Sequence, residues 1–362
     1  MENVCNPNNV SGLRQADFQK DIQGKKTDLF ILTNKNGCEV AFTNYGGALC
    51  AIMVPDREGK MGNVVQGHDT IDHVVNSPNE FLSTLIGRYG NRICKGRFTL
   101  DGKTYSLAIN NGPNALHGGP TGFHARVWDA EKLSENSARL HYVSADGEEG
   151  FPGTVEVTVT YTFTDDNEFV IDYEATTDQD TIINLTHHGF FCLCGSQKDT
   201  PSCERYLLTM NADHYIPIDD TSIPLGTVDA VEGTPFDFRT EHLVGERIDA
   251  DDVQTRNGAG YDHCWVLNKR QPGELTFAAK CVDPVTGRRM DVYTTEPGVQ
   301  VYTSNWHDGF AGSHGATYPK RSAICFECQH FPDSPNRAYF PSVVLKPGQI
   351  YTQTSIYKFS VE

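Results

Sequence analysis

Two adjacent histidines lie inside an apolar segment near the middle of the chain, residues 184–191, with the sequence NLTHHGFF. The segment has the composition of a buried β-strand, in which successive side chains point to opposite faces of the sheet. One imidazole of the pair His187 and His188 can therefore face a cleft while the other packs. The ordinary pKa of histidine, about 6.5, allows proton exchange near neutral pH. This pair predicts a single candidate general acid on a mid-chain strand.

A carboxylate has a similar apolar setting near the C-terminal end of the chain. Glu327 lies in a strand-like run, residues 324–331, which a Pro-rich loop follows. Burial raises the pKa of a carboxyl group and makes it a usable proton acceptor near neutral pH. A glutamate paired with a basic partner across the sheet explains this residue about equally well when it is taken alone. With the histidine, it makes general acid–base chemistry a hypothesis to carry forward.

The elements that would position these groups are short β-strands. Residues 154–163 alternate between apolar and polar, and the turn at 165–167 leads into a second apolar run at 169–173, which predicts a hairpin. Helical periodicity is scarce. Many short strands without intervening helices predict an all-β antiparallel sandwich or barrel. Further strands are expected at 41–44, 97–100, 105–107, 205–210, 274–281, 290–294, 299–303 and 350–359.

Charge and composition exclude several classes of partner. The 362 residues include 30 Lys and Arg against 47 Asp and Glu, a formal charge of −17 that repels nucleic acid and anionic lipid. No apolar run approaches the roughly 20 residues of a membrane helix, and residues 1–20 lack the basic-then-apolar order of a signal peptide. Eleven cysteines scattered through a large chain favour reduced thiols. We therefore expect a soluble cytoplasmic protein that binds neither nucleic acid nor membrane.

Metal and nucleotide motifs are weak in this chain. The closely spaced pairs Cys192–Cys194 and Cys325–Cys328 lack a second Cys/His pair that would complete a tetrahedral zinc site, and packing roles are favoured for them. Residues 67–73 contain two histidines and two aspartates, but the stretch is typical of a solvated turn. No glycine-rich phosphate-binding motif is present. We expect no metal and no cofactor.

Four polar clusters sit where loops meet the expected strands: residues 87–93, 114–119, 260–263 and 300–306. Each combines hydrogen-bonding side chains with glycine or an aromatic ring. Sugars require this mixture, because their hydroxyls take directional hydrogen bonds while their apolar faces stack on rings. Each cluster alone is also compatible with an ordinary turn, and a structural ion pair is the commoner role of an arginine such as Arg92.

Taken in order, these blocks resemble the aldose 1-epimerase (galactose mutarotase) family, from about Phe30 to about Lys358. The resemblance implies a large antiparallel β-sandwich of the galactose mutarotase type, with a sugar-binding cleft on one concave sheet. We expect residues 28–362 to form this single domain and residues 1–27 to be an N-terminal extension. The blocks that carry the resemblance are 45–47, 54–60, 87–93, 116–119, 150–153, 184–188, 260–263 and 327–336.

The resemblance also implies roles for particular residues. Position by position, the general base of the family falls on Glu327 and its general acid on His188. The activity implied is interconversion of the α and β anomers of free hexoses such as galactose and glucose. We expect no cofactor, and a monomer or weak homodimer. The substrate-holding positions fall on Asn91, Arg92, His117, Asp262 and Gln300, with Phe190 beside the acid.

The chain departs from the family pattern near the acid. The family commonly has Asn, Ser and Tyr where this chain has His187, Gly189 and Phe190, and Phe where it has Trp306. These departures remove a hydroxyl next to the acid and alter the ring available for stacking. We expect them to affect substrate preference more than reaction type.

Two alternatives belong to other functional classes. A non-catalytic carbohydrate-binding protein could use the same cleft, but it would need no matched acid and base. A glycoside hydrolase would need two carboxylates roughly 5–10 Å apart, and Asp262 could supply the second. A hexose-phosphate epimerase would need a basic cluster, of which only Arg92 is apparent. Free aldoses are therefore the preferred substrates.

Overall fold

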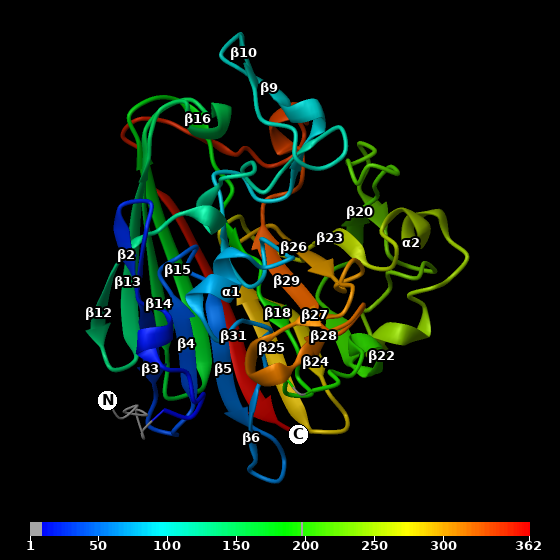
Figure 1. Cartoon of the computed structure of the whole chain (residues 1–362). Coiled ribbons are helices and arrows are strands. Elements are labelled where there is room, and N and C mark those ends of the chain that lie inside the picture. Colours follow the sequence, from blue (N-terminus) through cyan, green and yellow to red (C-terminus); the bar gives the residue numbers. More distant parts are fainter. Residues whose placement is uncertain (1–8, 197) are drawn as a thin grey trace.

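The computed structural model describes residues 9–196 and 198–362, and almost all of their regular structure is β (Figure 1). One layer of the molecule is a nine-stranded sheet whose neighbouring strands run antiparallel. In spatial order its strands are β12 (Asp129–Ser134), β13 (Ser137–Ser144), β14 (Val155–Phe163), β15 (Glu168–Thr177), β31 (Tyr351–Val361), β25 (Arg288–Thr294), β24 (Thr276–Val282), β19 (Leu207–Met210) and β22 (His242–Leu243).

Alternation of side chains fixes which face of this sheet is buried. In β14 every second residue from Val155 to Phe163 is buried, and the residues between them are half-buried or exposed. The strand pairs with β15 along its whole length, from Val155 opposite Thr177 to Phe163 opposite Phe169. The hairpin predicted from the sequence is confirmed.

The second layer consists of a six-stranded and a four-stranded antiparallel sheet. Residues 64–66, just after β6, join the two sheets. The backbone amide of Gln66 donates to the Phe190 carbonyl and the backbone amide of Cys192 to the Val64 carbonyl, both at 2.8 Å. In spatial order the six strands are β18 (Phe190–Phe191), β29 (Ile324–Gln329), β26 (Gly298–Tyr302), β23 (Asp262–Val266), β20 (His214–Ile216) and β21 (Asp229–Ala230), and the four are β3 (Leu29–Thr33), β4 (Glu39–Thr43), β5 (Leu49–Pro55) and β6 (Met61–Asn63).

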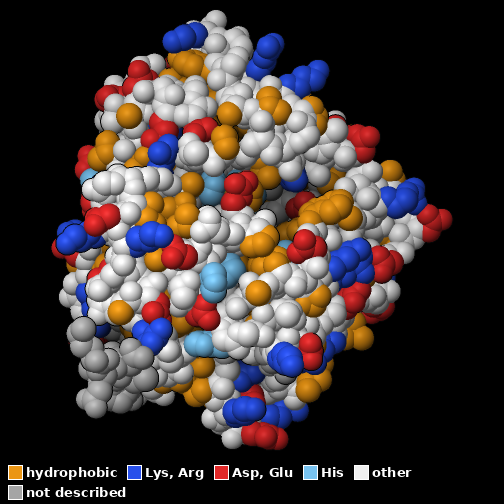
Figure 2. Space-filling view, in the orientation of Figure 1, with side chains coloured by type: hydrophobic (Ala, Val, Ile, Leu, Met, Phe, Trp, Pro, Cys, Tyr) orange, Lys and Arg blue, Asp and Glu red, His pale blue; other side chains and the backbone are white. Residues whose placement is uncertain are grey.

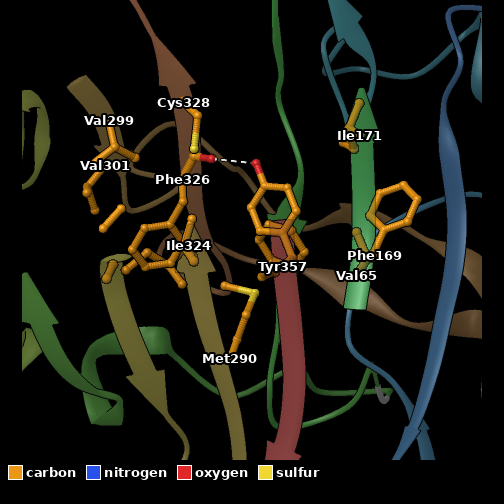
Figure 3. Close-up of a cluster of buried hydrophobic side chains, with 14 of the residues drawn as sticks. Val65, Phe169, Ile171, Met290, Val299, Val301, Ile324, Phe326, Cys328 and Tyr357 are labelled. Carbon is orange, nitrogen blue, oxygen red and sulfur yellow. Dashed lines mark hydrogen bonds between the residues drawn. The ribbon is translucent and has the colours of Figure 1, made fainter. Parts of the chain in front are cut away.

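The hydrophobic core lies between the two layers (Figure 3). Ile324 and Phe326 of β29 point toward β31 and β25, where Tyr357 and Met290 meet them. The Tyr357 hydroxyl donates to the Phe326 carbonyl at 2.8 Å. Because strand side chains alternate, Glu327 must project from the opposite face of β29, away from this core.

The remaining elements are short. The described chain has two α-helices, and neither is long and apolar enough to cross a membrane. They are α1 (Ile71–Val75) and α2 (Val253–Asn257). The small strand pairs are β1 (Lys20–Ile22) with β2 (Lys25–Thr27), β7 (Leu85–Ile86) with β17 (Thr186–His187), β8 (Arg92–Ile93) with β11 (Ala115–Leu116), β9 (Arg97–Leu100) with β10 (Lys103–Ser106), β16 (Thr181–Ile182) with β30 (Val344–Leu345), and β27 (Phe310–Ala311) with β28 (Thr317–Tyr318). Short 3₁₀ turns lie at Gln15–Asp17, Cys94–Gly96, Phe123–Ala125, Glu148–Gly150, Cys203–Arg205, Val244–Glu246, Ser313–Gly315 and Ser334–Asn336.

The expected N-terminal extension packs against the four-stranded sheet over its described part, residues 9–27. Leu13 and Phe18 are buried there beside Leu29 and Cys50. The backbone amide of Val10 donates to the carboxylate of Glu39 at 2.7 Å. The domain boundary at residue 28 stays a prediction, and residues 1–8 lie outside the described residues.

The architecture confirms the all-β antiparallel sandwich and differs from the sequence prediction at one place that matters. Residues 184–191 do not form a continuous strand. β17 pairs with β7, whereas β18 pairs with β29, and the chain changes partner at His188 and Gly189. The first catalytic candidate therefore lies in a break between two short strands.

Candidate active site

A cleft of about 490 Å³ opens on the outer face of the six-stranded sheet. Figure 2 shows a hollow near the centre of this face, over the region of β26 and β29 in Figure 1. Its walls combine residues of the sheet with two loop segments, 77–81 and 306–310. The lining includes Asn91, Arg92, His117, His188, Phe190, Asp262, Tyr302, Trp306, His307 and Glu327.

Glu327 stands on β29 directly opposite Gln300 of β26. Its side chain is 2% exposed, and Oε2 has no hydrogen-bond partner among the described residues. Burial, helped by the negative charge of Asp262 and opposed by Arg92, raises the pKa of this carboxyl well above its usual range. The strand thus holds a carboxyl whose protonated form is favoured by burial.

His188 faces Glu327 across the floor of the cleft, with Nε2 3.6 Å from Oε1. The break in the strand is fixed by its backbone, because the His188 amide donates to the Thr84 carbonyl at 2.9 Å and its carbonyl accepts from Ser83 at 3.2 Å. His187 points the other way and contacts the core residue Tyr161, with ring centroids 6.0 Å apart. One histidine faces the cleft and its neighbour packs, as the sequence predicted.

The pKa values of the two facing groups move in opposite directions. Burial lowers the pKa of His188 to about 3, while burial raises that of Glu327. Each group is therefore driven toward its neutral form, the carboxyl with a proton and the imidazole without its second one. The two groups lie 3.6 Å apart, close enough for the charge of one to affect the other. Such a pair can accept a proton at one atom and deliver one at another.

Asn91 and His117 hold one another at the side of the cleft. Both have left-handed backbone conformations, with φ of 64° and 52°, which is uncommon for residues other than glycine. The backbone amide of Asn91 donates to Nδ1 of His117 at 3.1 Å, and the backbone amide of His117 donates to the backbone carbonyl of Asn91 at 3.0 Å. Burial keeps the pKa of His117 well below its usual value. The neutral ring therefore carries its hydrogen on Nε2, which is a donor.

The glycine after His117 is required by close packing. Gly118 has φ of 83°, and a Cβ atom there would lie 2.0 Å from the carbonyl oxygen of Gly87. Any side chain at this position would push the His117 segment away from residues 87–92. The first glycine of the His-Gly-Gly motif is therefore required by close packing as well as by the conformation of the turn.

Arg92, Asp262 and Gln300 form the polar group at the other side of Glu327. Nη1 of Arg92 lies 3.8 Å from Oδ2 of Asp262, and its Nε donates to Oδ1 of Asn111 at 3.0 Å. The Gln300 amide donates to Oδ1 of Asp262 at 2.7 Å. The aspartate is thus oriented by two partners, and it keeps an acceptor surface toward the cleft.

Seven of the eight site residues predicted from the sequence line the cleft. The eighth, Gln300, is buried beside the cleft, where its side-chain amide donates to Asp262. Trp306 is 71% exposed at the mouth, where a ring can meet solvent or a bound molecule. Phe190 lines the cleft with its ring stacked on the imidazoles of both His188 and His307.

Several residues of the cleft carried no assigned role in the sequence analysis. Tyr302 belongs to the polar cluster at 300–306 and stands edge-on to His188, with centroids 6.0 Å apart. His307 lies one residue beyond that cluster. Phe81 and Asn79 come from a loop in which no motif is visible. Reading the cluster one residue further would have included His307, whereas no sequence signal pointed to the 77–81 loop.

The side chains of His117, His188 and Glu327 offer ligand atoms within 4.8 Å of one another, a set that could hold a metal ion. The hydrogen bond from Asn91 argues against this use. It occupies the Nδ1 lone pair of His117 and leaves a hydrogen, not a lone pair, on Nε2. The arrangement fits a hydroxyl acceptor better than a cation.

A buried imidazole and a buried carboxyl that face one another in a polar cleft of a β-sandwich fit the class of acid–base enzymes. Comparison with known proteins gives the particular family. The sequence profile of the family Aldose 1-epimerase matches residues 28–358. Galactose mutarotase of Bos taurus is 42% identical over 323 residues, 89% of this chain and 91% of that protein, and Aldose 1-epimerase of Escherichia coli (strain K12) is 34% identical over 94% of this chain and 97% of its own length.

Solved structures agree with this result. An aldose epimerase homologue from C. elegans superposes with a TM-score of 0.85 at 30% identity, covering 92% of this chain and 99% of that one. A galactose 1-epimerase from Lactobacillus acidophilus gives 0.81 at 26% identity, over 94% and 97% of the two chains. The chain belongs to the aldose 1-epimerase family of isomerases and has the galactose mutarotase fold.

Proposed function

We propose that this protein interconverts the α and β anomers of free aldoses, with galactose and glucose as substrates, and that His188 and Glu327 are its acid and base. The observation that carries the proposal is the 3.6 Å approach of these two side chains in the cleft. Relatives of the chain that carry the name galactose mutarotase support galactose as the first sugar to test.

The reaction is a reversible ring opening. Glu327 takes the proton of the C1 hydroxyl while His188 gives a proton to the ring oxygen, and the bond between C1 and that oxygen breaks. The resulting aldehyde rotates about the C1–C2 bond. Closure on its opposite face returns both protons and inverts C1. Acid and base catalysis of this kind contributes typically about 10²–10⁴-fold for each proton-transfer group.

The single proton of the resting pair is sufficient for this cycle. Burial places it on Glu327, whereas the reaction as written needs it on His188. The carboxylate and imidazolium that the reaction needs attract one another across 3.6 Å. Arg92 favours the same state, because its charge lowers the pKa of Glu327.

The remaining polar groups hold the sugar while its ring is open. Nε2–H of His117 and the guanidinium of Arg92 donate to hydroxyl oxygens, and Asp262 accepts from hydroxyl groups. The hydrogen bond from Gln300 keeps Asp262 in orientation. Fixed partners limit the rotations of the open chain to the one that inverts C1, which is a contribution of orientation.

The hydrolase alternative is weakened by the position of Asp262. A second catalytic carboxylate would have to be free to act on the anomeric carbon or a water molecule, but this one is held by Gln300 and Arg92. A sugar-binding protein without activity would have no use for a buried acid and base of opposite pKa shift.

The test is the decay of optical rotation of freshly dissolved α-D-galactose and α-D-glucose at low buffer concentration. We expect the protein to accelerate the decay and to release no phenol from an aryl galactoside. Saturable binding without acceleration would identify a binding protein instead, and release of the phenol would identify a hydrolase. No effect and no binding with either sugar would contradict the proposed substrates.

We further propose that the protein acts in the cytoplasm as a monomer or weak homodimer. The ten cysteines of the described chain are all free thiols, which suits a reducing compartment. Both proposed catalytic residues, His188 and Glu327, come from the same chain. Light scattering on the purified protein measures the oligomeric state directly.

A further inference from the structure

The orientation of the His188 ring is set by other rings. Its Nδ1 has no hydrogen-bond partner in the described chain beyond its own backbone, and Nε2 lies 3.6 Å from Glu327, too far for a hydrogen bond. Catalytic histidines are usually oriented by a hydrogen bond to the second ring nitrogen. Here, Phe190 stacks on the imidazole at 4.7 Å with planes 7° apart. Packing takes the place of that hydrogen bond.

Phe190 is in turn stacked on a second imidazole, that of His307. The centroids are 5.0 Å apart and the planes 20° apart. We call His188, Phe190 and His307 the ring stack. Its members come from two segments more than a hundred residues apart, so only the tertiary fold assembles it. With two imidazoles stacked on it, the Phe190 ring has little face left for a sugar.

His307 is itself fixed by a hydrogen bond whose direction can be assigned. Oδ1 of Asn79 accepts from the Phe81 amide at 3.1 Å, which sets the orientation of the Asn79 side chain. Nδ2 of Asn79 then donates to Nε2 of His307 at 3.2 Å. Burial lowers the pKa of His307 to about 4, so the ring is neutral and adds no charge that would oppose a protonated His188. The outer end of the ring stack is therefore uncharged and hydrogen-bonded to the 77–81 loop.

We propose that His307 is a positioning residue that acts through Phe190 to hold the ring of His188 in line with Glu327. The inference rests on the proposed function, in which His188 is the acid. His307 does not contact the reacting atoms. Without the ring of His307, Phe190 can tilt, and the plane of the His188 imidazole that stacks on Phe190 can tilt with it. A catalytic group misplaced by about 1 Å can cost up to 10²-fold in rate, so kcat falls while sugar binding is retained.

Two substitutions distinguish the effect of the His307 ring from the effect of its hydrogen bond to Asn79. His307→Phe keeps a planar ring on Phe190 and loses the contact with Asn79, whereas His307→Gln keeps an acceptor for Asn79 and loses the ring. We expect His307→Gln to lower kcat about tenfold with KM within about twofold, and His307→Phe to keep most of the activity. His68→Gln is the matched control, because His68 is another buried imidazole near Phe310 but lies outside the ring stack.

A second readout does not depend on turnover. The side-chain NMR signals of His188, in protein labelled with ¹³C-histidine, report the state of its ring even if neither sugar is a substrate. We expect one sharp set in the wild type and in His307→Phe, and a shifted or broadened set in His307→Gln. Unchanged signals and kcat in His307→Gln would overturn the inference. So would equal losses in His307→Gln and His68→Gln that follow thermal stability, or a greater loss in His307→Phe than in His307→Gln.

Discussion

On its inner face the six-stranded sheet presents Ile324, Phe326 and Val301 to the nine-stranded sheet, while its outer face presents Glu327 and Tyr302 to the cleft. The same strands supply both sets through simple alternation. The inner face is apolar and closely packed (Figure 3). The outer face leaves buried polar atoms without a hydrogen-bond partner in the described chain, including Oε2 of Glu327 and Oε1 of Gln300.

Unpaired buried polar atoms each cost about 1–3 kcal/mol. Here the tightly packed inner face fixes the backbone from which the outer groups project. The comparison teaches that stability and chemistry occupy opposite faces of one sheet. Substitutions on the two faces should therefore have different signatures.

The largest contrast is expected between the two neighbouring histidines. His188→Asn removes the proposed acid and should lower kcat about 10²–10⁴-fold with little change in thermal stability. His187→Asn changes a buried ring beside Tyr161 and should lower stability while the folded protein keeps kcat within a few-fold. Polarimetry and thermal unfolding of both variants make the test. Equal losses of kcat in the two variants would contradict the assignment of chemistry to one face of the sheet and stability to the other.

A core substitution on the same strand as the proposed base should show the opposite signature. Phe326→Ala leaves a cavity between the layers and should lower the free energy of unfolding by about 3–5 kcal/mol. The kcat of the folded fraction should remain close to that of the wild type, because Glu327 still projects from the other face. Denaturant unfolding and initial rates below the transition measure the two quantities. A stable but inactive variant would contradict this account.

Acid should destabilise the structure through its buried neutral histidines. Burial lowers the pKa of His187 and of His263 to about 3 and that of His124 to about 4. The unfolded chain, with ordinary values near 6.5, then binds more protons than the folded one between about pH 3 and 6.5. Stability is complete above pH 6.5 and falls as the pH drops, by about 2 kcal/mol for each such histidine at pH 5.

Urea unfolding at pH 7.5 and pH 5 measures this loss. The free energy of unfolding of His187→Gln should depend less steeply on pH than that of the wild type, because its unfolding takes up about one proton fewer. Equal stability of the wild type at the two pH values would show that these rings are not held neutral.

The smallest effect is expected at the rim of the cleft. Trp306 is 71% exposed and makes its contribution only when a sugar is bound. Trp306→Ala should raise KM about two- to fivefold with kcat and stability almost unchanged, because an exposed ring adds binding that is common to the ground and transition states. A fall in kcat of more than tenfold would place this side chain inside the catalytic machinery.

The sequence predicted the parts of the molecule that have a local signature. The alternation in residues 154–163 indicated β14, and the acid in the apolar run indicated that Glu327 lies on a strand. The break at His188 had no such signature, because it arises when the chain changes strand partner. The contact between Asn79 and His307 spans 228 residues and leaves no periodicity to detect. Local pattern therefore revealed the strands, whereas the ring stack required the fold.

The most direct test of the central claim uses Glu327→Gln, which keeps the size of the side chain and its hydrogen-bonding capacity but removes the titratable proton. The rate of anomer interconversion of α-D-galactose is measured with wild type and variant, together with their thermal stability and galactose affinity. We predict that the variant folds, binds galactose and loses nearly all turnover. A folded variant with close to wild-type activity would contradict the assignment of Glu327 as the base, and with it the account of the cleft.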